Sequence, residues 1–402
     1  MKILFLAHRI PYPPDKGEKI RAFHELKFLG ARHTVDLYCF ADSEAEACHK
    51  AALRSYCRHI YVEVRSRIKT LTGAARSFLK REPLSCGCFF SRKFRTEVRR
   101  ALATEDYDVV FVYCSSMAQY IPWPTGVPVV MDFVDIDSAK WSQYAKRSQP
   151  PLSWVYEREA KTLAAHEKKW ARASSSTMVT TWQEAALLRG EGIPPVEVVS
   201  NGVEIPATRL DAPPDGIRDL QPYVLFVGTM DYLPNIDAVE YFAEEILPRI
   251  LERHPKLKFA IVGRNPTRRV RKLGNKPGVI VTGGVPDVEV YLTGCTAVVA
   301  PFRIAQGIQN KLLEALAAGK PIVSTPGPAA AIAASHGETL LVAENAEEFA
   351  DAVVALLEDP TLYCRFSNGP EFVRRNFSWH ENLSHLEQLL LQAAGSCLAT
   401  TR

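Results

Sequence analysis

The 402-residue sequence has no uninterrupted apolar run that approaches the roughly 18–20 residues of a membrane-spanning helix. Its nine cysteines are scattered, and no two have the Cys-x-x-Cys spacing of a metal or redox pair. A disulfide framework and a structural zinc site are therefore disfavoured, and we expect the protein to work in a reducing cytoplasm. No Gly-x-Gly-x-x-Gly sequence follows the first apolar run, which argues against a Rossmann dehydrogenase.

Hydrophobic residues make up 47% of the chain and charged residues 23%, which excludes wholesale disorder, collagen and a coiled coil. At about 100–200 residues per domain, the length predicts most simply two domains of similar size. In the opening residues, His8, Arg9 and Pro11 interrupt the apolar run too early for a secretory signal. We expect a first β-strand there instead.

Short β-branched runs alternate with helical stretches along the chain, a pattern typical of parallel sheets built from βαβ units. The strands expected in the first half are Ile3–Ala7, Thr34–Phe40, Ile60–Val64, Val109–Tyr113, Val127–Phe133, Thr177–Thr181 and Val196–Val199. Those expected in the second half are Tyr223–Val227, Phe259–Val262, Val279–Thr282, Ala297–Ala300, Ile322–Ser324 and Leu340–Val342. Two separate series of strands predict two separate sheets.

The predicted fold class is α/β, with two doubly wound, Rossmann-like parallel sheets facing each other across a cleft. We expect a first domain over residues 1–200, a proline-rich linker over 201–222 and a second domain over 223–375. Residues 376–402 form a C-terminal helix and tail, and the helix is expected to pack back toward the first domain. Ligands of open parallel sheets bind beyond the carboxyl ends of the strands, so functional residues are expected in the loops that follow them.

Residues 65–100 form a strongly basic segment, with eleven basic side chains against two glutamates, whereas the whole chain carries only +4. Phenylalanines and leucines are interleaved with the charges. This composition predicts a surface for anionic membrane headgroups or for a phosphorylated partner. The alternative is a solvated helix face with the phenylalanines in the core. No nucleic-acid motif is present, and we expect no nucleic-acid partner.

The most informative stretch runs from Ala300 to Val323, where a loop with Gly307 precedes a helix expected over residues 308–318. The amino end of this helix presents backbone N–H groups and the positive end of the helix dipole, and so forms an anion site. Lys311 lies in the first turn, an unfavourable place for a cation unless an anion neutralises it. Glu314, one turn on, is placed to accept hydrogen bonds from ribose hydroxyls. The alternative is an ordinary amphipathic helix with a surface Lys–Glu pair.

This stretch resembles the signature helix of GT-B glycosyltransferases of glycosyltransferase family 4, which are retaining sugar-nucleotide enzymes. That family has two glutamates separated by seven residues around a Gly-rich loop, followed by Glu-Ala-Met-Ala-x-Gly-x-Pro-Val. Residues 314–323 read Glu-Ala-Leu-Ala-Ala-Gly-Lys-Pro-Ile-Val. The resemblance implies that Glu314 binds the nucleotide ribose. The first glutamate of the family falls on Gln306, an amide, which changes the usual contact to the donor sugar.

The donor domain of the family opens with a strand ending in glycine, and Tyr-Val-Leu-Phe-Val-Gly ends here at Gly228. The resemblance implies donor contacts at Gly228, Gln306, Gly307, Asn310, Lys311 and Glu314. It also implies one at Asn201, whose Asn-Gly turn resembles the family hinge, although Asn-Gly is a common turn dipeptide.

Many relatives grip the diphosphate with an Arg and a Lys after that glycine, but Thr229 and Asn235 stand here instead. We therefore expect Lys311 and Arg264 to neutralise the diphosphate, Arg264 because it follows an expected strand. The alternative for Arg264 is a surface arginine. Asn235 is expected simply to cap a helix over 236–250.

On the acceptor side, the loop Pro-Tyr-Pro-Pro-Asp-Lys-Gly resembles the family loop at which acceptor and donor meet, and it nominates Gly17, Lys19 and Arg21. Their alternative is a solvated helix start. Asp135 is expected to orient the acceptor hydroxyl, and Asp137 is expected to cap a helix. We expect no metal, because these acids do not follow a calcium-loop pattern and the enzymes resembled generally need none.

The resemblance covers nearly the whole chain, and its loop motifs are most similar to sugar transferases of bacterial exosortase (PEP-CTERM) exopolysaccharide loci. It implies transfer of a sugar from a nucleotide diphosphate sugar to a hydroxyl of a glycan or lipid-linked acceptor, with retention of configuration. Lys311, Arg264 and Asp135 are the catalytic candidates, and no cofactor beyond the donor is expected. The expected location is the cytoplasm or the inner face of its membrane.

Two other functions stay open from the sequence. A sugar-nucleotide epimerase also has two facing α/β domains, and it would convert the donor without an acceptor. A catalytically inactive scaffold that binds nucleotide sugars is suggested by the residues at Gln306, Thr229 and Asn235. Transferred sugar, epimerised donor or neither would separate the three.

Overall fold

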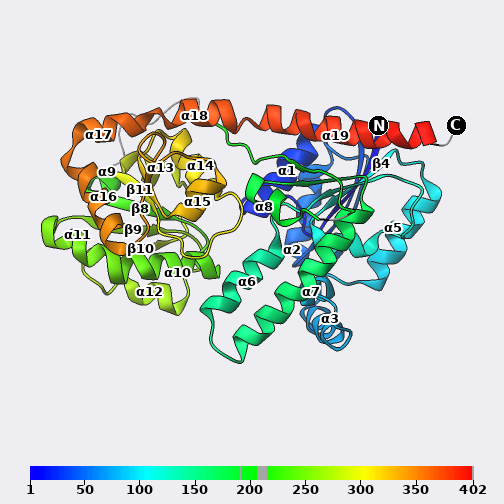
Figure 1. Cartoon of the computed structure of the whole chain (residues 1–402), viewed down its shortest axis with the longest axis horizontal. Coiled ribbons are helices and arrows are strands. Elements are labelled where there is room, and N and C mark those ends of the chain that lie inside the picture. The colour runs from blue at the N-terminus through cyan, green and yellow to red at the C-terminus, as the bar shows by residue number, and fades with distance from the viewer. Residues whose placement is uncertain (191, 206–214, 401–402) are drawn as a thin grey trace. The chain divides into compact units, whose positions relative to one another are not determined.

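The computed structural model describes residues 1–190, 192–205 and 215–400. The chain divides into two compact units (Figure 1), of which unit 1 comprises Met1–Ser200 and His380–Arg402, and unit 2 comprises Asn201–Trp379. Residues 206–214 of the expected linker lie outside the described residues. Each unit is built around one parallel sheet, and each is described by itself below.

The sheet of unit 1 has seven parallel strands in the order β3-β2-β1-β4-β5-β6-β7. The strands are β1 (Lys2–Ala7), β2 (Thr34–Ala41), β3 (His59–Val64), β4 (Val109–Tyr113), β5 (Val129–Asp132), β6 (Ser176–Val179) and β7 (Val196–Val198). The order reverses between β1 and β4, where Ile3 pairs with both Val35 and Val109. This reversal is the switch point at which open α/β sheets place their ligand sites.

Helices and short helical turns connect these strands. They are α1 (Gly17–Gly30), α2 (Glu44–Ala47), η1 (Cys48–Leu53), α3 (Arg67–Leu79), α4 (Leu84–Cys88), α5 (Arg92–Thr104), η2 (Ser115–Tyr120), α6 (Asp137–Arg147), α7 (Leu152–Ala173) and α8 (Trp182–Leu187). Asp137 was expected to cap α6, but the N-cap is Ile136 and makes no side-chain cap. Asp137 is instead the first helical residue, and Lys140 donates to its carboxylate.

The sheet of unit 2 has six parallel strands in the order β10-β9-β8-β11-β12-β13. The strands are β8 (Tyr223–Val227), β9 (Lys258–Val262), β10 (Val279–Gly283), β11 (Ala297–Ala300), β12 (Ile322–Ser324) and β13 (Leu341–Val342). Here the order reverses between β8 and β11, where Ala297 pairs with Val224. The carboxyl ends of β8 and β11 therefore define the switch point of unit 2.

The helices of unit 2 follow the same alternation. They are α9 (Asp215–Arg218), α10 (Leu233–Tyr241), η3 (Phe242–Ile246), α11 (Leu247–Arg253), α12 (Arg268–Leu273), α13 (Glu289–Gly294), α14 (Asn310–Ala317), α15 (Pro326–Ala331), α16 (Ala346–Glu358), α17 (Pro360–Arg365), η4 (Phe366–Asn368) and α18 (Gly369–Asn376). The single helix expected over 236–250 is longer and is interrupted by the π-helical turn η3. Asn235 lies inside α10, whose N-cap is Tyr232, so the expectation that Asn235 caps a helix was wrong.

The central strands are buried on both faces, which explains why they appear in the sequence as continuous apolar runs rather than alternating ones. Residues Ile3–Ala7 of β1 and Tyr223–Phe226 of β8 are fully enclosed. Every expected strand is present, and no strand end differs from the expected one by more than two residues. The expected doubly wound α/β fold class is confirmed.

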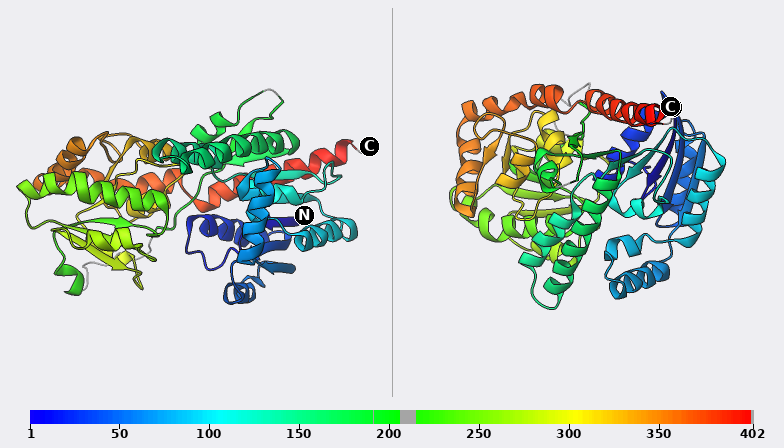
Figure 2. Two further views of the ribbon diagram at one scale, coloured as in Figure 1. Left: turned by 90° about the horizontal axis from the view of Figure 1, so that it is seen from below. Right: turned by 45° about the vertical axis from the view of Figure 1, so that its right-hand side comes forward.

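The C-terminal helix α19 (Trp379–Thr400) packs on unit 1, as expected. It runs alongside the blue N-terminal elements of that unit in Figures 1 and 2. The ring of His33, at the end of α1, lies 2.8 Å from the carboxylate of Glu387, and the rings of Phe28 and His380 meet edge to face. The last helix in the sequence thus completes the first unit.

None of the described helices combines the length and apolar character that a membrane-spanning segment requires.

Candidate active site

The switch point of unit 2 gathers most of the donor residues expected from the sequence. Gly228 follows β8 directly, and the loop after β11 leads through Gly307 into α14. Gly307 has a φ of 64°, in the left-handed region that glycine adopts without strain. The loop therefore turns sharply enough to bring the amino end of α14 back to the strand ends.

Two glycines let the backbone close tightly at this point. A Cβ on Gly263, which follows β9, would lie 1.6 Å from the carbonyl oxygen of Gly228. A Cβ on Gly228 would lie 2.9 Å from the Lys311 ammonium nitrogen and 2.7 Å from the Asn235 side-chain nitrogen. The loop after β8 and the side chain of Lys311 are thus in direct contact, and only glycine fits between them.

Lys311 reaches back from α14 across the end of β8. Its ammonium donates a 2.8 Å hydrogen bond to the Asn235 side-chain oxygen and lies over the rings of Phe226 and Phe302, at 4.5 and 4.7 Å. The Asn235 amide in turn donates to the carbonyl of Thr229. Among the described residues, no carboxylate lies within ion-pairing distance of Lys311. The Lys311 ammonium thus contacts one amide oxygen and two aromatic ring faces.

The surroundings of Lys311 disfavour its charge. Burial lowers the pKa of Lys311 to about 7, and the nearby Glu314 carboxylate opposes that shift. Burial also raises the pKa of Glu314, and Lys311 opposes this shift in turn. An anionic ligand at Lys311 would stabilise the ammonium form, because it would supply the negative charge that the protein does not place there.

The amino end of α14 lacks a side-chain cap from its N-cap residue. Gln309 occupies the N-cap position, and its side chain makes no hydrogen bond to the first backbone N–H groups of the helix. Asn310 is fixed by the buried Asn201, whose side-chain amide donates to its oxygen at 2.9 Å. The carbonyl of Gln306 accepts from Gln309 across the turn. Uncapped N–H groups at a helix start suit an oxyanion.

Arg264 lies beyond the end of β9 and is exposed. Its carbonyl accepts from the backbone N–H of Met230, which ties the loop after β9 to the loop after β8. The side chain also packs beside Gly284, where a Cβ would lie 2.9 Å from the Arg264 Cγ. Arg264 therefore lies in a loop that contacts the loop after β8, and Lys311 contacts that same loop at Gly228.

On unit 1, two of the expected acceptor residues turn inward. Arg21 is fully buried and donates to Asp132 at 2.7 Å and to the carbonyl of Val199 at 2.8 Å, with Glu25 3.0 Å away. Lys19 is buried and bonds Glu46. Gly17 begins α1 and is exposed. In this structure Arg21 pairs with Asp132 and Glu25, and Lys19 pairs with Glu46. Their role on the acceptor side stays a prediction.

Asp135 follows β5 and is partly buried. The Thr180 hydroxyl donates to Asp135 at 3.3 Å, and the buried Glu184 lies next to this pair, because Thr180 also bonds Glu184. Burial and the neighbouring Glu184 charge raise the pKa of Asp135 well above its usual range.

Residues around His8 were not nominated from the sequence, yet they occupy the switch point of unit 1. His8 follows β1, stacks on Tyr113 at the end of β4 and lies 4.0 Å from the Glu18 carboxylate. The signal was available in the sequence, since a histidine directly after the first strand of a doubly wound sheet falls at the ligand edge. His8 and Glu18 therefore join the candidate residues of unit 1.

These observations define an α/β protein with two Rossmann-like units, and they make the switch point of unit 2 a candidate anion site. Residues 221–359 match the family described as glycosyl transferases group 1, and residues 23–202 match the glycosyl transferase 4-like domain. The two matches span most of the chain. The chain belongs to this group 1, GT4-like family of GT-B glycosyltransferases, and the protein transfers a sugar from a nucleotide sugar.

Individual relatives are distant. An uncharacterised 44.6 kDa protein in the cps region of Klebsiella pneumoniae is 20% identical over 88% of this chain and 90% of its own length. A phosphatidyl-myo-inositol mannosyltransferase of Mycobacterium tuberculosis is 27% identical over 58% of this chain, and the match spans 62% of that enzyme, less than two thirds of its length.

Solved structures share the fold. A sucrose-phosphate synthase from Thermosynechococcus elongatus superposes with a TM-score of 0.71 at 18% identity, over 98% of this chain and 99% of that one. Anabaena Alr3699/HepE in complex with UDP-glucose superposes with a TM-score of 0.66 at 16% identity, over 98% and 100%. The GT-B fold is thus established for this chain.

Proposed function

We propose that the switch point of unit 2 binds the nucleotide diphosphate part of the donor. The diphosphate lies against Gly228 and the uncapped amino end of α14, with Lys311 and Arg264 as its cations. Glu314 accepts hydrogen bonds from the ribose hydroxyls, and Gln306, Asn310 and Asn201 complete the donor contacts. The observation that carries this proposal is the partly buried Lys311 ammonium, which contacts Asn235 beside Gly228 and has no carboxylate partner among the described residues.

The roles of these residues follow from the negative charge that develops on the leaving group. When the bond between the anomeric carbon and the diphosphate breaks, negative charge develops on the leaving oxygen. Backbone N–H groups and an ammonium that are already in place stabilise that charge without reorganising. Lys311 takes up a proton as the anion binds, because the anion reverses the effect of burial on its pKa. No protein nucleophile is needed for a retaining transfer in which the acceptor hydroxyl attacks from the leaving-group side.

The acceptor is a hydroxyl of a growing polysaccharide or of a lipid-linked glycan. Two relatives support this class, one encoded in a cps region and one that glycosylates a phosphatidyl-inositol. Asp135 orients the acceptor hydroxyl, and Gly17 lines the approach to it. The narrower assignment to PEP-CTERM exopolysaccharide loci stays a prediction from loop motifs alone.

Product analysis tests the proposal. The protein is screened by thermal shift against UDP-, GDP- and TDP-sugars, and the stabilising donor is then incubated with lipid-linked and polysaccharide acceptors. Transferred sugar with retained anomeric configuration, read by NMR, is the expected result. Epimerised donor, or donor binding that survives both Lys311→Met and Glu314→Ala, would overturn the site assignment.

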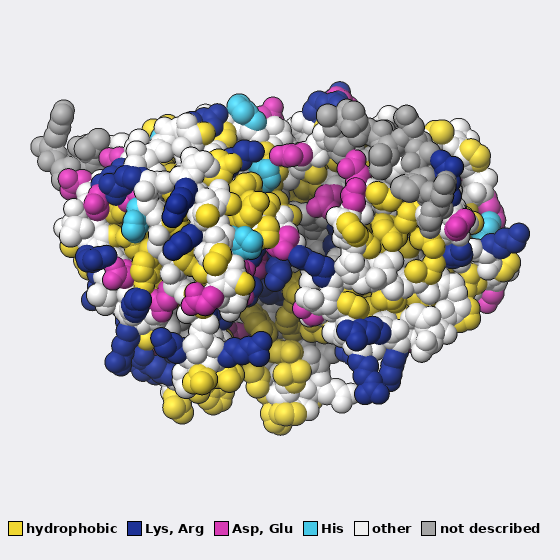
Figure 3. Space-filling view, turned by 180° about the vertical axis from the view of Figure 1, so that it is seen from behind, with side chains coloured by type: hydrophobic (Ala, Val, Ile, Leu, Met, Phe, Trp, Pro, Cys, Tyr) yellow, Lys and Arg dark blue, Asp and Glu magenta, His cyan; other side chains and the backbone are white. Residues whose placement is uncertain are grey.

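We also propose that unit 1 works at the inner surface of the cytoplasmic membrane. The basic segment forms α3, α4 and α5, and apolar side chains on α3 stand out in solvent, with Ile68 74%, Leu71 71% and Leu79 83% exposed. Trp154, near the start of α7, is 66% exposed. Figure 3 shows apolar and basic side chains side by side on the molecular surface. Exposed apolar groups flanked by cations suit an anionic bilayer.

Vesicle sedimentation tests this surface. Binding to vesicles that contain phosphatidylglycerol is expected, with release at high salt and in the double variant Leu71→Ser/Leu79→Ser. A protein that binds neutral and anionic vesicles equally, or neither, contradicts the membrane assignment.

A further inference from the structure

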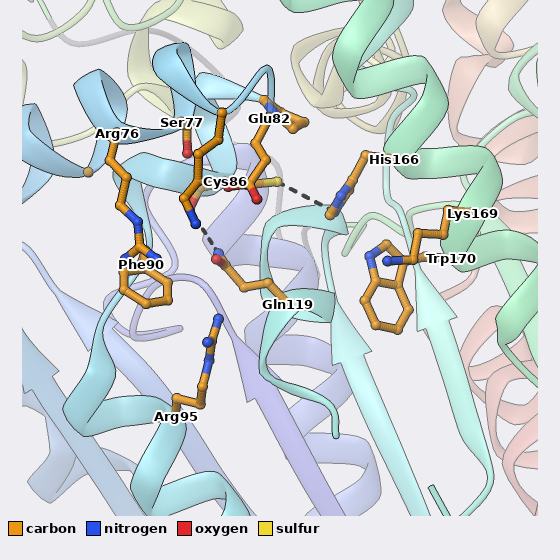
Figure 4. A pocket seen from close by; sticks show the side chains of 13 residues that line it. Arg76, Ser77, Glu82, Cys86, Phe90, Arg95, Gln119, His166, Lys169 and Trp170 are labelled. Atoms are coloured by element: carbon orange, nitrogen blue, oxygen red, sulfur yellow. Dashed lines mark hydrogen bonds between the residues drawn. The ribbon is translucent and has the colours of Figure 1, made fainter. Parts of the chain in front are cut away.

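A cavity of about 350 Å³ opens in unit 1, lined in large part by the basic segment of residues 65–100. Figure 4 shows side chains from several elements converging on it. α3 and the turn after it supply one wall, α4 and α5 a second, and η2 with α7 a third. The volume falls in the range of small-molecule sites, which begins at about 300 Å³.

The lining is strongly cationic. Four basic side chains line the cavity against the single carboxylate of Glu82, and these are Arg76, Lys80, Arg95 and Lys169. In the part of the chain that the structure describes, none of the four has a carboxylate within ion-pairing distance. Elsewhere in unit 1, buried or partly buried cations such as Arg21 and Lys19 do have such partners. Arg95 is the partly buried member of the four, and Arg76, Lys80 and Lys169 are exposed at the cavity mouth, so the cavity carries a net positive charge.

Two of these cations share one aromatic ring. The guanidinium carbons of Arg76 and Arg95 lie 4.8 and 4.6 Å from the centre of the Phe90 ring. The ring fixes both groups by cation–π contact, but the two positive charges repel each other. Burial and the charges of Arg99 and Arg76 lower the pKa of Arg95. An anion between the two guanidinium groups would relieve that repulsion.

Hydrogen-bond donors are also unused at the cavity. The Nε of Arg95 and the indole Nε1 of Trp170 are buried and have no hydrogen-bond partner. Trp170 is only 5% exposed, so its N–H cannot turn to bulk solvent. A buried donor without an acceptor costs free energy, and native proteins usually satisfy it with a ligand or water. The unused groups at this site are donors, as an oxyanion requires.

The cavity is next to the apolar surface of α3. Arg76 and Ser77 line it, whereas Phe78 and Leu79, which follow them, are 52% and 83% exposed. Arg158 of α7 holds this end of α3, because it lies 4.6 Å from the Phe78 ring centre and donates to the Phe78 carbonyl. A ligand whose charged group enters the cavity would therefore have exposed apolar side chains beside it.

We propose that this cavity binds a phosphate group, carried by the lipid part of the acceptor or present as a free anion. Arg76 and Arg95 bind the phosphate oxygens on the Phe90 side of the cavity, and Lys80 and Lys169 add long-range attraction. Guanidinium groups suit this task because their planar N–H donors match the phosphate oxygens. The assignment of the ligand as acceptor rests on the proposed function, whereas phosphate binding itself does not.

Calorimetry of the full chain tests the proposal. All titrations use the Lys311→Met background, so that the donor site contributes no diphosphate binding. The probes are inorganic phosphate, dihexanoyl phosphatidic acid and dihexanoylglycerol, the last being a lipid without phosphate. We expect binding of the first two and not of the third. Tighter binding of the phosphatidic acid assigns the site to a lipid phosphate, and equal binding assigns it to a free anion.

Matched variants locate the binding. Arg95→Gln and Arg76→Gln are each expected to weaken phosphate binding about tenfold, the effect of losing one charge-assisted hydrogen bond. Arg99→Gln removes the same charge from the exposed side of α5 and should have little effect. Phosphate binding that is absent, or that Arg95→Gln and Arg99→Gln weaken equally, overturns the proposal. Nucleoside diphosphate binding by the Arg95→Gln variant with Lys311 intact is measured separately, so that failure here is distinct from failure of the donor site.

Discussion

The strand order of each sheet reverses at a switch point, but the cations at the two switch points differ in whether carboxylates neutralise them. At the carboxyl ends of the strands in unit 1, the cations have carboxylate partners within the fold: Arg9 with Glu18 and Asp42, and Arg21 with Asp132. In unit 2, Lys311 contacts an amide oxygen and two ring faces, and no carboxylate of the described residues lies within ion-pairing distance of it. The shared topology decides where a ligand can bind. The side chains decide whether the positive charge at that edge is neutralised by carboxylates of the protein or is left for an anionic ligand.

The largest effect on activity should come from replacing Lys311, which has no carboxylate partner among the described residues. Lys311→Met is expected to lower sugar transfer by about 10²–10³-fold, because preorganised charge at the leaving group is lost. Circular dichroism should remain unchanged. Lys272→Met, an exposed change on α12 of the same unit, is the control and should retain full activity. Equal activity of the two variants would remove Lys311 from the mechanism.

Arg21, whose charge is neutralised by carboxylates, should affect the stability of the fold rather than donor binding. Arg21→Met leaves the buried Asp132 and Glu25 carboxylates without their partner and should lower the free energy of unfolding by about 3–5 kcal/mol. Urea unfolding measures this loss, and binding of the nucleotide to unit 2 should persist in the folded variant. Arg54→Met is the exposed control. A loss no greater than that of the control would show that the buried network contributes little to stability.

A smaller loss of stability should follow when an added Cβ crowds the backbone at the proposed donor site. Gly263→Ala places a Cβ against the Gly228 carbonyl and should cost about 1–3 kcal/mol of unfolding free energy, with weaker donor binding as the loop shifts. Gly327→Ala is the matched control, because its Cβ meets only the Ala305 side chain at 3.6 Å. Thermal unfolding and donor titration of both variants separate the two cases. Similar behaviour of the two variants would refute the close approach.

The stability of the protein should also depend on pH through Lys311. Its pKa falls from the ordinary 10.5 to about 7 in the folded chain, so between these values the unfolded chain binds more protons than the folded one. Stability from this group therefore rises as the pH increases from about 7 toward 10. Urea unfolding at pH 7 and pH 9.5 should show wild type gaining stability relative to Lys311→Met. A constant difference would mean that the pKa is not lowered.

Much of the fold followed from local patterns, because strands buried on both faces leave continuous apolar runs. Strands such as Val109–Tyr113 and Ala297–Ala300 have the expected bounds. The helix with Lys311 was also expected, and its bounds differ only slightly. Patterns confined to a few neighbouring residues thus predicted the elements and their sheets.

Side-chain partners were harder to foresee. Asn235 was expected to cap a helix, but it accepts a hydrogen bond from Lys311, 76 residues further along the chain. Arg21 was nominated for the acceptor side, which stays a prediction, and its hydrogen bond to Asp132, 111 residues away, was not foreseen. No local pattern reports such pairs, because they form only where the parallel strands bring their carboxyl ends together.

The order of apolar and polar residues was enough to specify two doubly wound sheets and the loops at their carboxyl ends, since burial of strands is a property of short segments. Which cations are neutralised inside the protein, and which await an anion, was decided by tertiary packing alone. The reason is that charge compensation depends on distances in space of a few ångströms, and residues far apart in the chain set those distances.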